Sequence, residues 1–309
     1  MQTTNSILLV RPAHFGYNSE TAESNAFQSN ETHQVQEIAQ KALREFDMLA
    51  ARLAEKGVNV CTAKDTTHPI KPDALFPNNW VSFHANGQVI IYPMLAPSRR
   101  HERREAIIHQ VGKSFDVHQI VDLTMNEASG RILEGTGSMV FDHTARIAYA
   151  CRSPRTEKSL FEETCSRLHY EPVFFDALDQ KGGEIYHTNV MMTIGNDFAV
   201  VCLESFKHSS EKSYVMERLE ASGREIIAIS HTQMQSFCGN MLELAIPNKK
   251  NILALSTTAF GHLNASQKKV LEQSCELVPL NVETVERFGG GSVRCMIAEI
   301  FLPPRRASD

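Results

Sequence analysis

The order of hydrophobic and polar positions repeats along the 309 residues of the chain. Five segments have the periodicity of an amphipathic helix and begin after a polar stretch. They start near Glu31, Arg100, Thr156, Ser210 and Ser266, so the last four starts are roughly 55 residues apart. Near-equal periods with the same internal order are typical of repeat architectures. The chain is therefore predicted to consist of five similar modules.

Each predicted helix is followed by a short apolar strand and then by a hairpin-like pair of strands. The single strands are VNVCTA, FDVHQIV, EPVFF, EIIAIS and ELVPL. Turns within the pairs contain Asn-Gly, Asp-His, Gly-Asn-Asp and Pro-Asn, which favour hairpins. The last pair, RCMIAEIFLP, is predicted to be completed by SILLVRP from the N-terminus, which would close a ring.

This pattern predicts an α/β fold in which five αβ modules form a closed array with their loops converging on the axis. A ligand pocket is expected at that centre. No linker rich in Gly, Ser or Pro interrupts the chain, so residues 1–309 are predicted to form a single domain.

Composition and charge narrow the classes of function. The formal net charge is −5 with acids and bases mixed, which argues against a nucleic-acid partner because phosphate binding needs a basic face. No apolar run reaches the roughly 18 residues of a membrane helix, and no signal peptide is recognised. The seven cysteines include no CxxC pair, which fits a reducing, cytoplasmic location. Neither a metal nor an organic cofactor is implied.

Three glycine-containing segments hold the candidate catalytic residues. Cys295 follows GGGSVR and could act as a nucleophile if a lowered pKa or a nearby base activates it. His187 opens the third hairpin in GGEIYHTN, and Glu134 opens the second in LEGTGS, so this carboxylate could orient the imidazole. A buried structural thiol, a structural histidine and a solvated turn acid are the alternative interpretations.

Polar residues before the first hairpin are candidate substrate ligands. The segment PDALFPNNW places a carboxylate, Asp73, and two amides, Asn78 and Asn79, beside the only Trp of the chain. A few polar groups on an apolar wall suit a planar ligand that forms hydrogen bonds.

Arginines before two of the predicted helices are candidate ligands for a carboxylate, which arginine commonly holds through two parallel hydrogen bonds. These are Arg99 in PSRR and Arg155 in RSPRTE, with Arg100 and Arg152 as alternatives. A solvated helix start is the interpretation that gives them no function.

Taken together and in this order, these segments resemble those of the guanidino-group modifying enzymes, whose fold is the pentein, a five-bladed αβ propeller. That superfamily includes arginine deiminases, dimethylarginine dimethylaminohydrolases, amidinotransferases and succinylarginine dihydrolases. GGGSVRCM resembles the nucleophile loop, LEGTGS the segment of the catalytic acid, and EIYHTN the segment of the catalytic histidine. DALFPNN resembles the substrate-binding stretch of the dimethylargininases. The resemblance covers nearly the whole chain and implies that Arg99 and Arg155 hold the substrate α-carboxylate.

The chain departs from this pattern at two amides. Asn189 stands two residues after the histidine, where arginine deiminases have Asp, and Asn79 stands where deiminases and dimethylargininases have Asp. A buried guanidinium is best held by carboxylates, whereas an amide offers a donor and an acceptor to a neutral ureido group. The stretch VRPAHFGYNSETAESNAFQ also resembles the citrulline-utilisation hydrolases, which look like citrulline ureidases.

The sequence therefore predicts a hydrolase that converts citrulline into ornithine, carbon dioxide and ammonia through an S-carbamoyl enzyme, with Asp73, Asn79 and Asn189 around the ureido group. The binding partner of the enzyme would be a small-molecule amino-acid substrate. The sequence does not decide between a monomer and a homo-oligomer. Because Asp73 is a carboxylate, arginine deiminase, dimethylargininase or amidinotransferase activity is an alternative. A catalytically silent pentein that only binds or acts as a scaffold is the alternative of another class, against which the intact Cys, His and Glu set argues.

Overall fold

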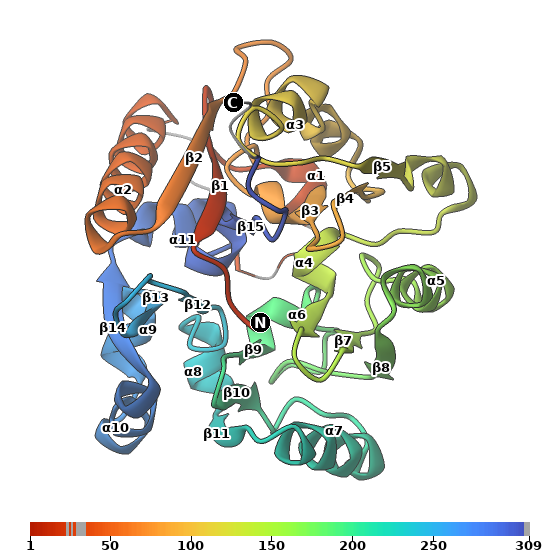
Figure 1. The fold of residues 1–309 in the computed structure, drawn as a ribbon, viewed down its shortest axis with the longest axis vertical. Helices are drawn as coiled ribbons and strands as arrows, with labels where there is room; N and C mark the ends of the chain where they lie inside the picture. Colours follow the sequence, from red (N-terminus) through yellow and green to blue (C-terminus); the bar gives the residue numbers. More distant parts are fainter. Residues whose placement is uncertain (23–24, 26, 29–34, 306–309) are drawn as a thin grey trace.

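The computed structural model describes residues 1–22, 25, 27, 28 and 35–305. Five three-stranded sheets surround a common centre in these residues, and the longer helices lie on the outside (Figure 1). In every sheet the middle strand pairs antiparallel with one neighbour and parallel with the other. The predicted α/β fold of five modules is confirmed.

The strands and helices have the following bounds. In spatial order the sheets contain β15 (Ala298–Glu299), β1 (Ser6–Arg11) and β2 (Asn59–Lys64); β3 (Val81–Phe83), β4 (Gln88–Ile91) and β5 (Gln119–Asp122); β6 (Val140–Asp142), β7 (Ile147–Cys151) and β8 (Glu171–Phe175); β9 (Met192–Ile194), β10 (Phe198–Cys202) and β11 (Glu225–Ile229); and β12 (Leu242–Leu244), β13 (Asn251–Ser256) and β14 (Cys275–Leu280). The helices are α1 (Ser19–Ala22), α2 (Val35–Lys56), α3 (Glu105–Val111), α4 (Gly135–Ser138), α5 (Lys158–Leu168), α6 (Thr188–Met191), α7 (Ser209–Ala221), α8 (His231–Gln235), α9 (Thr257–His262), α10 (Ala265–Ser274) and α11 (Glu283–Gly289). The 3-10 helices are η2 (Pro77–Asn79), η3 (Pro97–Glu102), η4 (Thr124–Ser129) and η5 (Val293–Met296).

The first and last strands close the ring. β1 pairs antiparallel with β15, where Ile7 lies opposite Glu299 and Leu8 opposite Ala298, and β1 pairs in parallel with β2 on its other side. The pairing expected between SILLVRP and the C-terminal strand is therefore confirmed.

The predicted helix starts are close for three modules and wrong for one. Helices α5, α7 and α10 begin within two residues of the predicted positions, whereas the start near Glu31 lies outside the described residues. The helix predicted near Arg100 is instead the 3-10 helix η3, followed by extended backbone at Arg103 and Arg104 before α3 begins. Pro97 favours this first turn, and an ion pair between Arg99 and Glu102 holds it.

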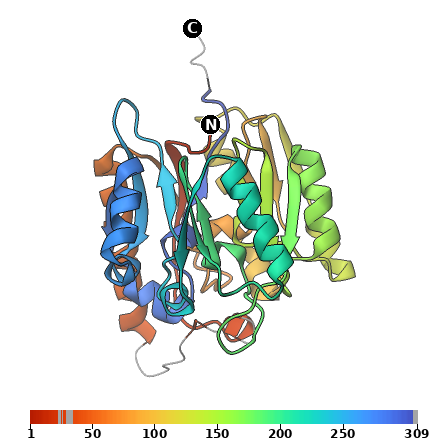
Figure 2. The ribbon, with the colours of Figure 1, turned by 90° about the horizontal axis from the view of Figure 1, so that it is seen from below.

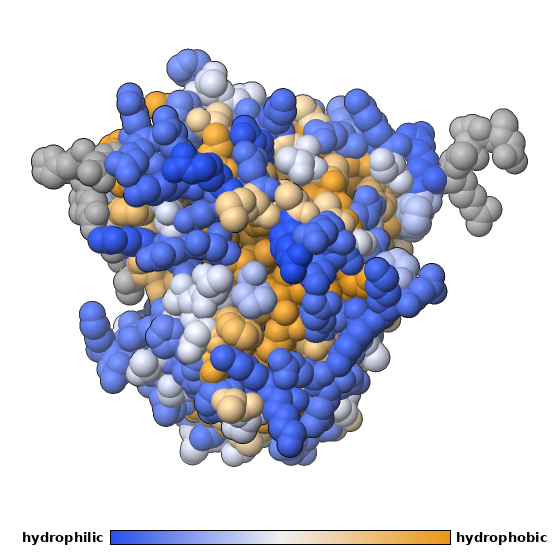
Figure 3. Space-filling model, turned by 90° about the vertical axis from the view of Figure 1, so that its left-hand side faces the viewer, coloured by the Kyte–Doolittle hydropathy of each residue, from blue (hydrophilic) through white to orange (hydrophobic). Residues whose placement is uncertain are grey.

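Helix α2 shows how the hydrophobic pattern produces the outer layer. Its buried positions recur at helical spacing and are Ile38, Ala42, Phe46, Leu49 and Leu53. They pack with side chains of β1 and β14, and a fully buried large apolar side chain contributes about 1.5–3 kcal/mol. Figure 3 views the molecule from this side and shows hydrophilic side chains over much of the surface, with hydrophobic ones gathered near the middle.

Among the helices that the structure describes, none combines the length and the apolar character needed to cross a bilayer.

Candidate active site

Short helical turns at the ring centre carry or border the candidate catalytic residues and the candidate substrate ligand Asn79. Asn79 ends η2, Glu134 precedes α4, His187 precedes α6, and Cys295 lies within η5. Each turn stands directly before the inner strand of a different sheet, so four modules contribute to one site. The strand predicted within RCMIAEIFLP begins later than expected, because Cys295 lies in η5 and β15 starts at Ala298.

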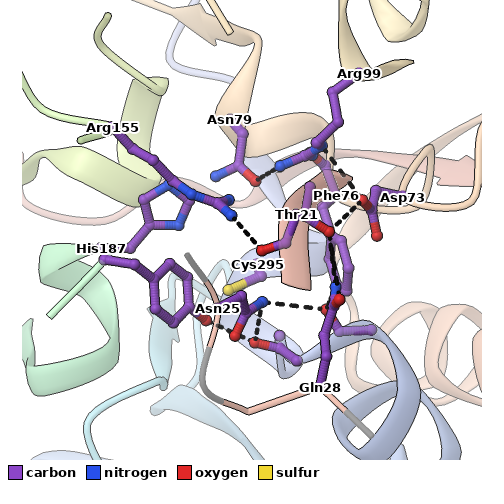
Figure 4. Close-up of a pocket in the computed structure, with 14 residues that line it drawn as sticks. Thr21, Asn25, Gln28, Asp73, Phe76, Asn79, Arg99, Arg155, His187 and Cys295 are labelled. Atoms are coloured by element: carbon purple, nitrogen blue, oxygen red, sulfur yellow. Dashed lines mark hydrogen bonds and ion pairs between the residues drawn. The ribbon is translucent and has the colours of Figure 1, made fainter. Parts of the chain in front are cut away.

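A cavity with an empty volume of about 270 Å³ lies between these turns (Figure 4). Six of the predicted site residues line it: Asp73, Asn79, Arg99, Arg155, His187 and Cys295. Its remaining walls are formed by Thr21, Asn25, Gln28, Phe76, Tyr186 and the three glycines 289–291. In the view of Figure 4, Arg155 and His187 lie on one side, Arg99 and Asp73 on the other, and Cys295 between them.

Three of the predicted site residues do not line the cavity. Glu134 is fully buried behind His187, and Asn189 is buried next to the thiol of Cys295. Asn78 is also fully buried, and its side-chain atoms have no hydrogen-bond partner within the described residues. Its role as a ligand for substrate therefore rests on the sequence alone.

A histidine–carboxylate pair forms one side of the site. The Nε2 atom of His187 lies 2.8 Å from Oε2 of Glu134, whose other oxygen accepts the Leu95 N–H at 3.0 Å. Burial alone would raise the pKa of Glu134. This effect is outweighed by the positive charge of Arg155 at 3.4 Å, by the hydrogen bond to His187 and by the charge of Arg99 at 3.8 Å, all of which lower the pKa. The net pKa lies well below the usual range, so Glu134 is a carboxylate at neutral pH.

The charge on Glu134 determines which nitrogen of His187 is basic. Since the carboxylate accepts, Nε2 carries the hydrogen and Nδ1 is the free acceptor. A Cβ atom added to Gly137 would lie 2.8 Å from Nδ1 and 2.3 Å from the Asn79 amide, so only glycine keeps this space open. Burial lowers the pKa of His187 to about 4 despite the bond to Glu134, and the imidazole is neutral at pH 7.

Two amides surround the sulfur of Cys295. The Nδ2 atom of Asn240 lies 3.3 Å from Sγ, and Nδ2 of Asn189 lies 3.6 Å from it. The Asn240 amide is fixed, because its Oδ1 accepts the Arg294 N–H at 3.1 Å and its Nδ2 also donates to the Asn189 carbonyl at 2.8 Å. Burial raises the pKa of Cys295, and hydrogen bonds from Ser292 and Asn240 only partly oppose this. The resting group is a thiol, so it needs a base to become a nucleophile.

A second polar array lies around Arg99. Its Nε and Nη2 atoms each donate to Glu102 at 2.9 Å, and its Nη1 donates to Asn79 Oδ1 at 2.9 Å. Asp73 Oδ2 accepts from Asn18 at 2.7 Å and lies 3.8 Å from Arg99. Within the described residues, Asp73 Oδ1 and Asn79 Nδ2 have no partner, although both side chains are buried and line the cavity. An unpaired buried acceptor and donor favour a ligand that supplies the missing hydrogen bonds.

The structure separates the two pairs of candidate arginines. Arg99 and Arg155 line the cavity, and Arg155 also donates to the Thr21 carbonyl at 3.2 Å. Arg100 instead faces Glu127 at 3.2 Å, and the exposed Arg152 pairs with Asp176 at 2.8 Å. Neither Arg100 nor Arg152 is among the residues that line the cavity.

Several residues at the site were not recognised in the sequence. Asn240 opens the fourth hairpin, so its position in the repeat was the available signal. Tyr186, whose hydroxyl donates to the Gly290 carbonyl at 2.6 Å, directly precedes the predicted histidine. Asn25 also bonds the Gly290 carbonyl, at 3.3 Å, and a Cβ atom at Gly290, where φ is +65°, would meet its amide. Asn25 lies in the N-terminal stretch whose resemblance was noted but to which no role was assigned.

No group of three His, Cys, Asp or Glu side chains in the described part of the chain is arranged to hold a metal ion.

Comparison with known families identifies the type of protein. The model of the family described as N,N dimethylarginine dimethylhydrolase, eukaryotic, matches residues 11–302. The chain belongs to this family. It is thereby a member of the guanidino-group modifying superfamily and of its hydrolases of C–N bonds, as the motifs around Cys295, His187 and Glu134 indicated. No curated protein matches the chain significantly.

Solved structures agree with the pentein fold of this family. The N-terminal domain of ArgZ, an arginine dihydrolase from the ornithine–ammonia cycle in Cyanobacteria, is 15% identical with a TM-score of 0.75, over 96% of this chain and 98% of that domain. AgrE bound to L-arginine is 16% identical with a TM-score of 0.76, over 97% of this chain and 40% of AgrE. A dimethylarginine dimethylaminohydrolase is 14% identical with a TM-score of 0.65, over 96% of this chain and 100% of that chain. The chain thus spans about two-fifths of the full-length ArgZ and AgrE.

Proposed function

We propose that the protein hydrolyses the ureido group of citrulline and releases ornithine, carbon dioxide and ammonia. One observation carries this proposal: the sulfur of Cys295 is in contact with two amides, Asn189 and Asn240, whereas Asp73 is the one carboxylate among the described residues that line the cavity. An amide can form hydrogen bonds with a neutral ureido group, whereas a guanidinium cation would require a carboxylate next to Cys295.

The charges of the cavity fit an amino acid with a neutral side chain. Arg99 and Arg155 supply donors for the α-carboxylate. Asp73 stands 3.8 Å from Arg99, and in this proposal its unpaired oxygen accepts from the α-ammonium group instead of the ureido group. The side chain of citrulline then reaches Cys295 without bringing a further charge. Arginine would bury one more cation with no second carboxylate to meet it.

In the first chemical step, the thiol proton of Cys295 passes to the neutral His187, and Sγ forms a bond with the ureido carbon. Glu134 stabilises the resulting imidazolium at 2.8 Å. His187 then protonates the δ nitrogen as its bond to the carbon breaks. Ornithine leaves, and the enzyme holds an S-carbamoyl group.

In the second step, His187 removes a proton from water, which attacks the carbamoyl carbon. The carbon–sulfur bond breaks, the thiol of Cys295 recovers the proton, and carbamic acid is released. Carbamic acid decomposes into carbon dioxide and ammonia. Every proton is accounted for by the thiol, His187 and water, so no redox partner is required.

Hydrolysis of arginine or a methylated arginine is the second candidate. It is favoured by the family match and by the names of ArgZ, an arginine dihydrolase, and AgrE, solved with L-arginine. The unpaired Oδ1 atom of Asp73 would then be the one carboxylate contact of the guanidinium group.

Incubation of the purified protein with citrulline, arginine and methylated arginines, followed by product identification by mass, tests the proposal. Citrulline should give ornithine with a higher kcat/KM than any guanidino compound. A protein that processes arginine preferentially and leaves citrulline unchanged contradicts the proposed substrate and supports the second candidate.

Arg155→Gln should raise KM for citrulline by about 10- to 100-fold, because it removes a charge-assisted contact worth roughly 1.5–3 kcal/mol. Arg152→Gln is the matched control, since this neighbouring arginine is exposed and outside the cavity. Steady-state kinetics of both variants would be measured together with their melting temperatures. An unchanged KM in folded Arg155→Gln places the α-carboxylate elsewhere.

The pH profile should reflect the lowered pKa of His187, which must be neutral to accept the thiol proton. Because burial lowers that pKa to about 4, kcat/KM is expected to stay level from pH 7 to about 5 and to fall towards pH 4. Folding stability should decline over the same range. The unfolded histidine binds its proton near pH 6.5 while the folded one does not, so stability present above pH 6.5 is lost as pH falls towards 4. Rates would be taken only where circular dichroism shows folded protein, and an acid limb near pH 6.5 in folded protein is inconsistent with this role.

A further inference from the structure

A second cavity, with an empty volume of about 950 Å³, opens on the face of the ring opposite the candidate active site. Met1 is among the residues that line it, and the N-terminus lies on the upper side in Figure 2, whereas α1, whose Thr21 lines the active-site cavity, lies on the lower side. Strand β3 leads from Asn79 to His84 in this cavity, and β6 leads from the α4 turn to His143. Each strand has three residues, so about 10 Å of sheet separates the two sites.

The walls of this cavity carry positive charge and no negative charge. No Asp or Glu is among the described residues that line it, and Arg146 is the one Arg or Lys among them; His84 and His143 also line it but are neutral at pH 7. Burial, together with the charge of Arg146, lowers the pKa of His84 to about 3, and burial with the same neighbour and others lowers that of His143 to about 3. A concave surface with one sign of charge attracts ligands of the opposite sign.

Aromatic rings line the same cavity. The rings of His143 and Phe301 lie 4.3 Å apart between centroids, and the Nδ1 atom of His143 is 2.7 Å from the Tyr170 hydroxyl. The guanidinium of Arg146 lies 4.0 Å above the Tyr170 ring. Such walls provide stacking surfaces for a planar group next to a fixed cation.

The backbone fixes the positions of two residues of this cavity. Arg146 and His169 both have left-handed backbone angles, with φ of 61° and 59°. The Nε atom of Arg146 donates to the His169 carbonyl at 3.2 Å, which ties the two positions together. His169 is the left-handed C-cap residue of α5, and Arg146 lies in the turn between β6 and β7, so both angles belong to the ends of these elements. Here the conformation directs the Arg146 side chain over the ring wall of the cavity.

We propose that this second cavity binds a ligand that combines a planar ring with an anionic group. The ring lies against His143, Phe301 and Tyr170, and the anionic group is bound by Arg146. This site is separate from the candidate active site, so the proposal does not depend on the substrate of Cys295.

Calorimetric titration of the full chain tests the proposal with three probes: adenosine 5′-monophosphate, adenosine and inorganic phosphate. The nucleotide, with ring and anion together, should bind saturably and at least about tenfold more tightly than either part alone, a difference of about 1.4 kcal/mol. Saturating citrulline should leave this affinity unchanged. Absence of saturable binding by the nucleotide, or its displacement by citrulline, overturns the proposal.

Arg146→Asn is the decisive variant, since Asn tolerates the left-handed backbone; the change removes the cation, its contact with Tyr170 and its hydrogen bonds to the Leu168 and His169 carbonyls. Arg152→Asn is the control, because this arginine also stacks on a ring, that of Phe174, but outside both cavities. We expect at least a tenfold loss of nucleotide affinity in Arg146→Asn and none in Arg152→Asn. Equal affinity in wild type and Arg146→Asn, with folding verified by melting, overturns the assignment of the anion to Arg146.

Discussion

Cys295→Ser is expected to lower kcat by at least about a thousandfold while the protein stays folded. The resting thiol already has a raised pKa through burial, so its reactivity depends on proton transfer to the neutral His187. A serine hydroxyl is far less acidic, so His187 would remove its proton much less readily. Because Cys295 is buried and serine is smaller, the change is not expected to disturb packing beyond the loss of the sulfur.

Cys165→Ser provides the matched control for this result. Cys165 is also a buried thiol with a pKa raised by burial, to about 12, but it packs between α5 and its sheet and does not line the cavity. Activity and thermal melting of both variants would be measured in parallel. Wild-type turnover by folded Cys295→Ser would remove this residue from the mechanism, whatever the substrate.

Asn189→Asp should shift substrate preference from citrulline towards arginine by at least about tenfold, and discrimination built on buried polar pairs reaches about 10⁴-fold at its upper end. The Asn189 amide lies 3.6 Å from the sulfur of Cys295, so a carboxylate there would lie next to the reacting atom. With citrulline this charge would be buried without a partner, whereas the guanidinium of arginine would neutralise it.

The measurement for this prediction is kcat/KM for citrulline and arginine in wild type, Asn189→Asp and Asn79→Asp. Asn79→Asp should shift preference less, because Arg99 already bonds this side chain at 2.9 Å and would neutralise part of the new charge. Asn248→Asp, at an exposed turn, is the control. If wild type prefers citrulline but neither active-site variant shifts its preference towards arginine, citrulline is kept as the substrate. The explanation of this selectivity by the amides is then rejected.

The order of elements could be predicted from the sequence because each module depends on local signals. Hydrophobic periodicity and turn residues identified the hairpins and the outer helices α5, α7 and α10. The helix predicted near Arg100 was wrong because a contact between side chains decided its shape. Arg99 turns into the cavity and pairs with Glu102, which stabilises a 3-10 turn that helix propensity does not favour.

The candidate site was predictable where glycine marks it. The segments around Cys295, Glu134 and His187 each contain glycines, and Gly137 is required by the close approach of His187 and Asn79. Asn240 also follows a glycine, Gly239, but this segment was not recognised as part of the site. The contact of Asn240 with the sulfur exists only because η5 and the start of the fourth hairpin meet at the ring centre. The raised pKa of the thiol likewise results from burial, which a sequence pattern does not reveal.

The pairing of β1 with β15 sets the order in which the protein can fold during synthesis. β1 is made before the other fourteen strands described and can pair with β2 as soon as α2 has formed, but its other edge must wait for β15. Contacts of such long sequence separation form late because the entropy of closing the loop must be overcome first. Until then β1 presents an open edge, to which a strand of another chain could add. The ring can therefore close only after β15 has been synthesised.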